Sequence, residues 1–173
     1  YQISQYEDSI LIFGGYFPKY LLDSLDYFTP VGKYSTLQDS FKNEIFKFSK
    51  KNKIILVYPI PEFEKNPNQI ILNQWVKQGF PENFDAQNLT TSFEGYKNRT
   101  KSSFELLDSI QNDNIYRVYP HTLFCNTTVK NRCLAKDNAN MFYQDNNHPS
   151  SKGAEMINDL IMKQIEKIEL KSN

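Results

Sequence analysis

The chain has 173 residues, a length that suits one domain over residues 1–173 with a core large enough to fold without a metal or a set of disulfides. Its 20 Lys and Arg residues balance its 20 Asp and Glu residues, and this zero net charge argues against a nucleic-acid partner, because nucleic-acid-binding proteins usually carry a basic excess. An aromatic content of 14% argues against a disordered chain, and no apolar run approaches the roughly 18–20 residues of a membrane span.

Apolar runs and amphipathic stretches alternate along the sequence. Short apolar runs that end at Gly or Pro predict buried strands over residues 9–13, 53–58 and 114–119. Apolar residues at helical spacing predict helices over residues 41–53 and 93–111, and a final helix that Ser150 or Ser151 caps. Buried strands separated by helices indicate an α/β fold, with a central parallel sheet covered on both faces.

In such sheets, catalytic and binding residues gather in the loops that follow the strands. The segment after the third predicted strand contains Asp145 and His148 on a turn before the last helix. A carboxylate at this spacing can accept a hydrogen bond from one imidazole nitrogen, which leaves the other nitrogen available as a base. The alternative is that Asp145 only caps the turn and His148 is a surface residue. The other histidine, His121, has no comparable acidic neighbour, and we expect it to be structural or exposed.

The two cysteines, Cys125 and Cys133, are separated by a short polar stretch. Their spacing is too wide for a zinc knuckle, and further ligands are lacking nearby, so we expect no metal site. Two free thiols or one disulfide remain possible. The surrounding turn residues favour the disulfide, which implies an oxidising compartment.

Four motifs, in chain order, resemble the SGNH domains that are fused behind bacterial acyltransferase family 3 membrane proteins. Residues 143–154, YQDNNHPSSKGA, are similar to the closing block of the SGNH hydrolase and acyltransferase superfamily. Residues 54–62, IILVYPIPE, resemble the strand of the narrower group that ends in a Pro-x-Pro-Glu turn. The stretch 96–110 with Arg99, and the cysteine pair upstream of the closing block, also fit that group.

This resemblance implies a flavodoxin-like, three-layer fold with a Ser-His-Asp triad. A serine would attack the acyl donor, His148 would take its proton, and Asp145 would orient His148. The acyl group, commonly acetyl, would come from an attached transmembrane domain and pass to a hydroxyl of an envelope polysaccharide such as O-antigen. The resemblance implies no cofactor, and it implies that this domain is the periplasmic part of an inner-membrane protein.

The sequence departs from the family pattern at the nucleophile. It contains no Gly-Asp-Ser, the motif that carries the serine in the superfamily. We therefore expect the serine strand, and the strand that follows it, to lie upstream of Tyr1. A secreted carbohydrate esterase of the same superfamily is one alternative function. Another is a non-catalytic glycan-binding or structural domain without the serine.

Two further features have both a functional and a structural interpretation. Gly14 and Gly15 stand where the superfamily has a block that contributes to the oxyanion hole, so their backbone N–H groups are candidate oxyanion donors. Alternatively, the two glycines only allow a turn. Trp75 and Phe80 lie in an excursion rich in Pro, Asn and Gln over residues 62–92. They form either a wall that stacks on a sugar or a small satellite core under a long loop.

Overall fold

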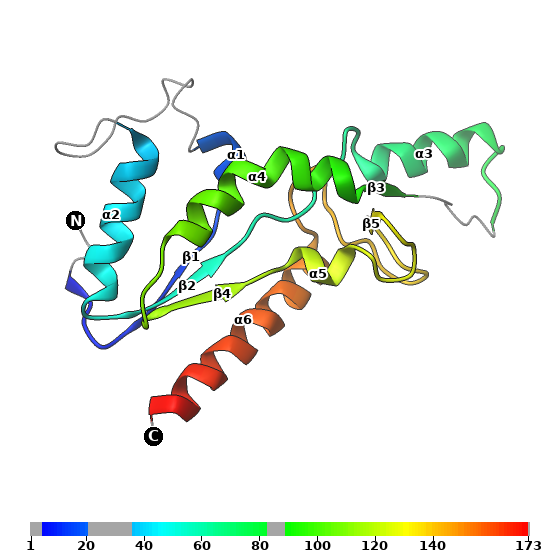
Figure 1. Cartoon of the computed structure of the whole chain (residues 1–173). Helices are drawn as coiled ribbons and strands as arrows, with labels where there is room; N and C mark the ends of the chain where they lie inside the picture. Colours follow the sequence, from blue (N-terminus) through cyan, green and yellow to red (C-terminus); the bar gives the residue numbers. More distant parts are fainter. Residues whose placement is uncertain (1–4, 21–35, 83–88, 173) are drawn as a thin grey trace. The chain divides into compact units, whose positions relative to one another are not determined.

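The computed structural model describes residues 5–20, 36–82 and 89–172 (Figure 1). The chain divides into two compact units. The first consists of Tyr1–Pro59, Arg99–Tyr119 and Leu160–Asn173. The second consists of Ile60–Asn98 and Pro120–Asp159. The boundaries fall inside two helices, so α4 (Phe93–Ser109) and α6 (Ser151–Ser172) each contribute residues to both units.

The first unit contains a parallel sheet of three strands. These strands are β1 (Ile10–Phe13), β2 (Lys53–Val57) and β4 (Ile115–Val118), in the order β1-β2-β4. Ile12 pairs with Ile55 across the first two strands, and Ile55 pairs with Tyr116 across the next two. The prediction of an α/β fold with a central parallel sheet is confirmed, and each strand lies within its expected range. The prediction that residues 9–13 form a buried strand is wrong, because β1 lies at the edge of the described sheet and its Ile12 is exposed.

Helices cover both faces of this sheet, because successive side chains of a strand point in opposite directions. Ile54 and Leu56 of β2 cluster with residues of α2 (Leu37–Ser49) and α4 on one face. Ile55, between them, clusters with Ile168 of α6 on the other face. Figure 1 shows α6 across the sheet from α2 and α4. This three-layer arrangement explains why the strands have continuous apolar sequences rather than alternating ones.

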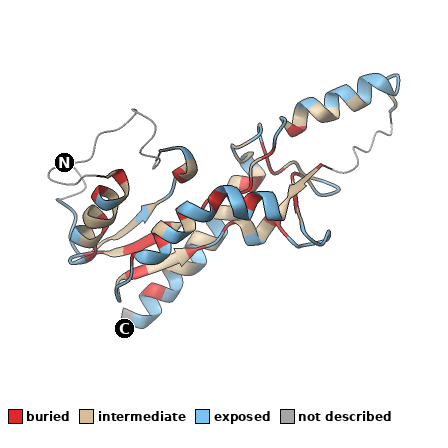
Figure 2. Ribbon diagram, turned by 45° about the horizontal axis from the view of Figure 1, so that its top comes forward, coloured by how far each residue is buried: buried red, intermediate tan, exposed pale blue. Residues whose placement is uncertain are grey.

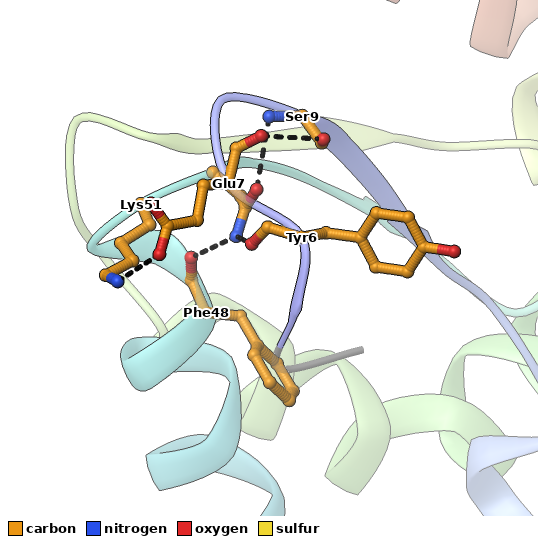
Figure 3. A network of polar contacts seen from close by, with 6 residues as sticks. Tyr6, Glu7, Ser9, Phe48 and Lys51 are labelled. Carbon is orange, nitrogen blue, oxygen red and sulfur yellow. Dashed lines mark hydrogen bonds and ion pairs between the residues drawn. The ribbon is translucent and has the colours of Figure 1, made fainter. Parts of the chain in front are cut away.

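A buried asparagine ties the segment before β1 to the turn between α2 and β2. The side-chain oxygen of Asn52 accepts a hydrogen bond from the backbone N–H of Ser9. Its amide nitrogen donates to the carbonyl oxygens of Tyr6 and Phe48. An exposed ion pair between Lys51 and Glu7 lies beside this network (Figure 3). These bonds satisfy the polar groups of Asn52, whose burial would otherwise cost free energy.

The second unit contains α3 (Pro67–Lys77), the short helix α5 (His121–Phe124) and an antiparallel pair of strands, β3 (Thr90–Ser92) and β5 (Arg132–Leu134). Its core is a separate apolar cluster: Phe63, Leu89, Phe124, Ala135, Phe142 and Tyr143. Cys125 and Cys133 form a disulfide in this unit, as the sequence predicted. In the chain-entropy model, closing so short a loop stabilises the fold by about 2–3 kcal/mol.

The structure differs from the predicted elements at several places, including α5 and β5, which the sequence analysis did not predict. Helix α2 begins at Leu37 and ends at Ser49, rather than covering residues 41–53, because Thr36 caps its start and residues 50–52 form a turn. Residues 62–92 contain α3 and β3, which the apolar pattern did not predict. The short helix α1 (Phe17–Tyr20) also lacked a sequence signal. Within the described residues, no helix is long and apolar enough to span a membrane.

Candidate active site

Asp145 and His148 form a hydrogen-bonded pair on the turn before α6. The Asp145 Oδ2 atom lies 2.8 Å from Nδ1 of His148. Because an ionised carboxylate only accepts hydrogen bonds, Nδ1 carries the proton in this pair, and Nε2 is the nitrogen that can take another. The His148 side chain is 71% exposed, so a reactant can reach the ring from solvent. This is the hydrogen bond that the sequence spacing predicted.

The backbone of the same turn holds the Asp145 carboxylate. Its Oδ1 atom accepts hydrogen bonds from the N–H groups of Asn147, at 2.9 Å, and His148, at 2.8 Å. These two backbone donors, with the His148 ring as a further contribution, lower the pKa of Asp145 below its usual value. Asp145 is therefore ionised at neutral pH. One oxygen fixes the turn while the other orients the imidazole.

The β2–α3 connection and the first turn of α3 hold this turn in place. The Asn68 side-chain amide, in the first turn of α3, donates to the carbonyl oxygens of Tyr143, at 3.2 Å, and Gln144, at 2.7 Å. The backbone N–H of Phe63 donates to the carbonyl oxygen of Asn146, at 2.8 Å. Within the turn, the Gln144 N–H donates to the carbonyl oxygen of His148. These bonds constrain the backbone on both sides of Asp145.

The start of α6 packs tightly against the strand-like segment before the turn. Ser150 is the N-cap residue: its Oγ atom accepts from the Gly153 N–H at 3.1 Å and donates to the Met141 carbonyl oxygen at 2.6 Å. A Cβ atom on Gly153 would lie 2.1 Å from the carbonyl oxygen of Phe142. Position 153 therefore requires glycine, because any side chain would push the helix away from the segment that leads into the catalytic candidates.

The other site candidates belong to other segments of the described chain. Gly14 and Gly15 follow β1 in the first unit, where both are exposed, whereas Asp145 and His148 belong to the second unit. Their assignment as oxyanion donors stays a prediction. A Cβ on Gly14 would meet the Val57 side chain at 3.3 Å, whereas a Cβ on Gly15 would meet open space. A close approach to β2 is thus one structural reason for glycine at position 14.

His121 occupies an aromatic environment at the start of α5. Its ring stacks on Phe93, with ring centroids 6.2 Å apart, and contacts Tyr96 at 5.4 Å. Burial lowers the pKa of His121, so the ring is held in its neutral form at neutral pH. This position fits the structural role predicted for it. Among the described residues, no group of three or more His, Cys, Asp or Glu side chains gathers where it could hold a metal ion.

Comparison with known proteins identifies the family. Residues 2–163 match the family described as the SGNH domain fused to AT3 domains. The chain belongs to this SGNH family. No curated protein gives a significant match. The closing block that carries Asp145, His148 and Gly153 is thus part of an SGNH domain, and the resemblance seen in the sequence is confirmed.

The SGNH fold is also seen in a solved relative. The chain is similar to the periplasmic domain of a lipopolysaccharide acetyltransferase from Salmonella ser. Paratyphi A, with 16% sequence identity and a TM-score of 0.50. The likeness covers 75% of this chain and 48% of the solved one, so this chain corresponds to about half the length of that structure. At this identity, the comparison supports the shared fold.

Asn68 is the residue of this SGNH site that sequence reasoning missed. Its contact with the Asp145 turn joins positions far apart in the sequence, and no local pattern predicts such a contact. A helix-start signal was nevertheless present: Asn66 caps α3 and Pro67 follows it at the first helical position. Recognising this signal would have placed Asn68 in the first turn of a helix, although not beside the catalytic candidates.

Proposed function

We propose that this SGNH domain transfers an acyl group, most simply acetyl, to hydroxyls of a cell-envelope polysaccharide in the bacterial periplasm. The observation that carries the proposal is the Asp145–His148 pair, in which the carboxylate orients an exposed imidazole. The family match to domains fused to AT3 domains supports an attached membrane domain as the source of the acyl group. The solved relative, a lipopolysaccharide acetyltransferase domain, supports a polysaccharide acceptor.

In the proposed reaction, His148 acts first as a base and then as an acid. A serine hydroxyl attacks the acyl carbonyl of the donor while Nε2 of His148 removes the hydroxyl proton. The donor's leaving group departs with that proton, and an acyl-serine ester remains. A sugar hydroxyl then attacks this ester, gives its proton to Nε2, and the proton returns to the serine oxygen. Asp145 stabilises the imidazolium that forms in each half-reaction.

The nucleophile of this reaction is not assigned to a residue of the present sequence. Every Asp-Ser pair in the chain lacks the preceding glycine of the superfamily motif. The proposal therefore requires a serine from outside these 173 residues. Backbone N–H groups of Gly14 and Gly15 are its candidate oxyanion donors, each expected to contribute about 3–4 kcal/mol to the transition state.

Replacing His148 tests the proposal in the complete gene product. A strain that lacks the gene is complemented with wild type, His148→Ala or Lys152→Ala, and the O-acetyl content of its surface polysaccharide is measured by proton NMR. We expect His148→Ala to remove O-acetylation, because no base remains to activate the serine. Lys152→Ala, which changes a partly exposed neighbour on α6, should leave it unchanged.

The same measurement separates the alternative functions. A carbohydrate esterase removes acetyl groups, so its loss would raise the O-acetyl content rather than lower it. A non-catalytic domain would give the same O-acetyl content with His148→Ala as with wild type. Either result, with the variant protein folded and present at wild-type amounts, contradicts the proposal.

A further inference from the structure

Helix α3 buries some of its apolar side chains and presents others to solvent. Pro67, at its first position, is the buried residue of α3, and Ile70 and Ile71 pack against the core of the second unit. Figure 2 shows most of the helix as exposed or intermediate. The next apolar residues are exposed: Leu72, Trp75, Val76 and, just beyond the helix, Phe80. An exposed group of large apolar residues on a polar protein marks a binding surface more often than chance.

Trp75 and Phe80 form a fixed aromatic pair on this surface. Their ring centroids lie 4.9 Å apart at an interplanar angle of 89°. The indole N–H of Trp75 donates to the carbonyl oxygen of Pro81 at 3.2 Å, so the indole is held in one orientation. Trp75 remains 37% exposed and Phe80 58% exposed. They are not the covered satellite core that was the alternative interpretation of the sequence.

The backbone at Phe80 adds an independent observation. Phe80 has a φ of 59°, in the left-handed region that bulky residues rarely adopt. Gly79, just before it, also has a positive φ, of 74°. Because the Phe80 side chain is mostly exposed, it buries little apolar surface on folding. That burial therefore contributes little free energy to offset the cost of the backbone strain. Such a residue is more easily explained by a ligand that its ring contacts than by the stability of the fold.

The polar residues of α3 indicate the chemistry of that ligand. Gln69, Asn73 and Gln74 supply amide groups, with Gln69 donating to Asn73, and the only charged residue in α3 is Lys77. An interfacial membrane helix would carry several Lys or Arg residues on its polar face. Amides both donate and accept hydrogen bonds, as sugar hydroxyls do. The apolar C–H face of a pyranose ring packs on an aromatic ring, so this surface fits a neutral carbohydrate better than a lipid headgroup.

Helix α3 also connects this surface to the Asp145–His148 turn. Asn68 in its first turn donates to Tyr143 and Gln144, immediately before Asp145. Trp75 lies about two turns further along the same helix, or roughly 10 Å along its axis. A short stretch of polysaccharide spans such a distance. The aromatic pair and the turn thus lie within one unit, at a separation that a polymeric acceptor can bridge.

From these observations we infer that Trp75 and Phe80, at the end of α3 away from the Asp145–His148 turn, form a subsite for the acceptor polysaccharide. The inference rests on the proposed function, because it assigns a place to that reaction's acceptor. The subsite holds a sugar unit further along the acceptor polymer from the one that is modified. It therefore contributes to acceptor affinity, whereas the chemical step is carried out at His148.

Trp75 gives a direct readout of binding, because it is the only tryptophan in the chain. The 173-residue protein is titrated with O-polysaccharide released by mild acid from the lipopolysaccharide of the strain that encodes it, and Trp75 fluorescence is followed. Phe80→Leu keeps an apolar side chain but removes the ring. We expect Phe80→Leu to weaken binding at least about tenfold and Phe80→Tyr to retain it. Val129→Ala, an exposed apolar residue on another loop of the same unit, is the control and should bind as wild type does.

Three results would overturn the inference. The first is no saturable change in Trp75 fluorescence with the O-polysaccharide, and the second is equal binding by wild type and Phe80→Leu. The third is a fluorescence change with phosphatidylglycerol vesicles but not with the polysaccharide. Failure of the proposed function is distinguishable. If the polysaccharide binds through Phe80 but His148→Ala leaves O-acetylation intact, the subsite is supported and the proposed reaction is contradicted. If His148→Ala abolishes O-acetylation but the O-polysaccharide does not bind, the proposed reaction is supported and the subsite is contradicted.

Discussion

At the scale of single residues, the Asp145 carboxylate serves two purposes with its two oxygens. Oδ1 accepts hydrogen bonds from two backbone N–H groups and closes the turn. Oδ2 accepts a hydrogen bond from the protonated Nδ1 of His148. Asp137 provides an internal comparison, because its Oδ1 accepts from the N–H groups of Ala139 and Asn140 in the same way. Within the described part of the chain, Asp137 has no histidine among its hydrogen-bond partners. The imidazole is therefore what distinguishes the site from an ordinary aspartate turn.

The lowered pKa of Asp145 predicts a pH-dependent contribution to stability. The folded chain binds a proton at Asp145 less readily than the unfolded chain, whose aspartates titrate near pH ~3.9, so the contribution is present above that pH. It is lost as the pH falls through the lowered pKa. We expect wild type to be more stable than Asp145→Asn at pH 7, with the difference narrowing in acid. Urea denaturation of both proteins from pH 7 down to pH 3 measures this; a constant difference across the range would contradict the account.

At the scale of elements, the position of the turn depends on how closely α6 approaches the segment before it. Gly153 lies against the backbone carbonyl of Phe142, and Ser150 joins the helix start to Met141. Backbone atoms cannot move aside as a flexible side chain can. The distance between helix and segment is therefore fixed by the absence of a side chain at one position.

Gly153→Ala should destabilise the protein by about 1–3 kcal/mol, because the new methyl group overlaps the Phe142 carbonyl. Gly95→Ala in α4 is the matched control. A Cβ there meets Ser92 at an ordinary 3.4 Å, and alanine favours helices, so the change should be neutral or slightly stabilising. Thermal unfolding of both variants measures the difference. Equal stability of Gly153→Ala and Gly95→Ala would show that the close approach does not constrain α6.

At the scale of the whole molecule, the predictable features were local ones. The three strands were readable as apolar runs ended by Gly or Pro, and the Asp145–His148 bond follows from two residues on one turn. The β3–β5 pair and the Asn68 contact were not predictable, because both join segments distant in sequence. Helix α3 was missed because the Pro, Asn and Gln residues of this segment favoured a loop, although Ile71, Leu72, Trp75 and Val76 recur at helical spacing.

The central claim is that His148, oriented by the Asp145 carboxylate, acts as the base of acyl transfer. Asparagine at position 145 places an amide where the Oδ2 acceptor stands, which favours the wrong imidazole tautomer. It should slow transfer by about 10³–10⁴-fold. The most direct measurement is the O-acetyl content of surface polysaccharide in a gene-deletion strain complemented with Asp145→Asn or with Asp137→Asn. The account predicts loss of O-acetylation with Asp145→Asn and wild-type O-acetylation with Asp137→Asn; wild-type O-acetylation with both variants would contradict it.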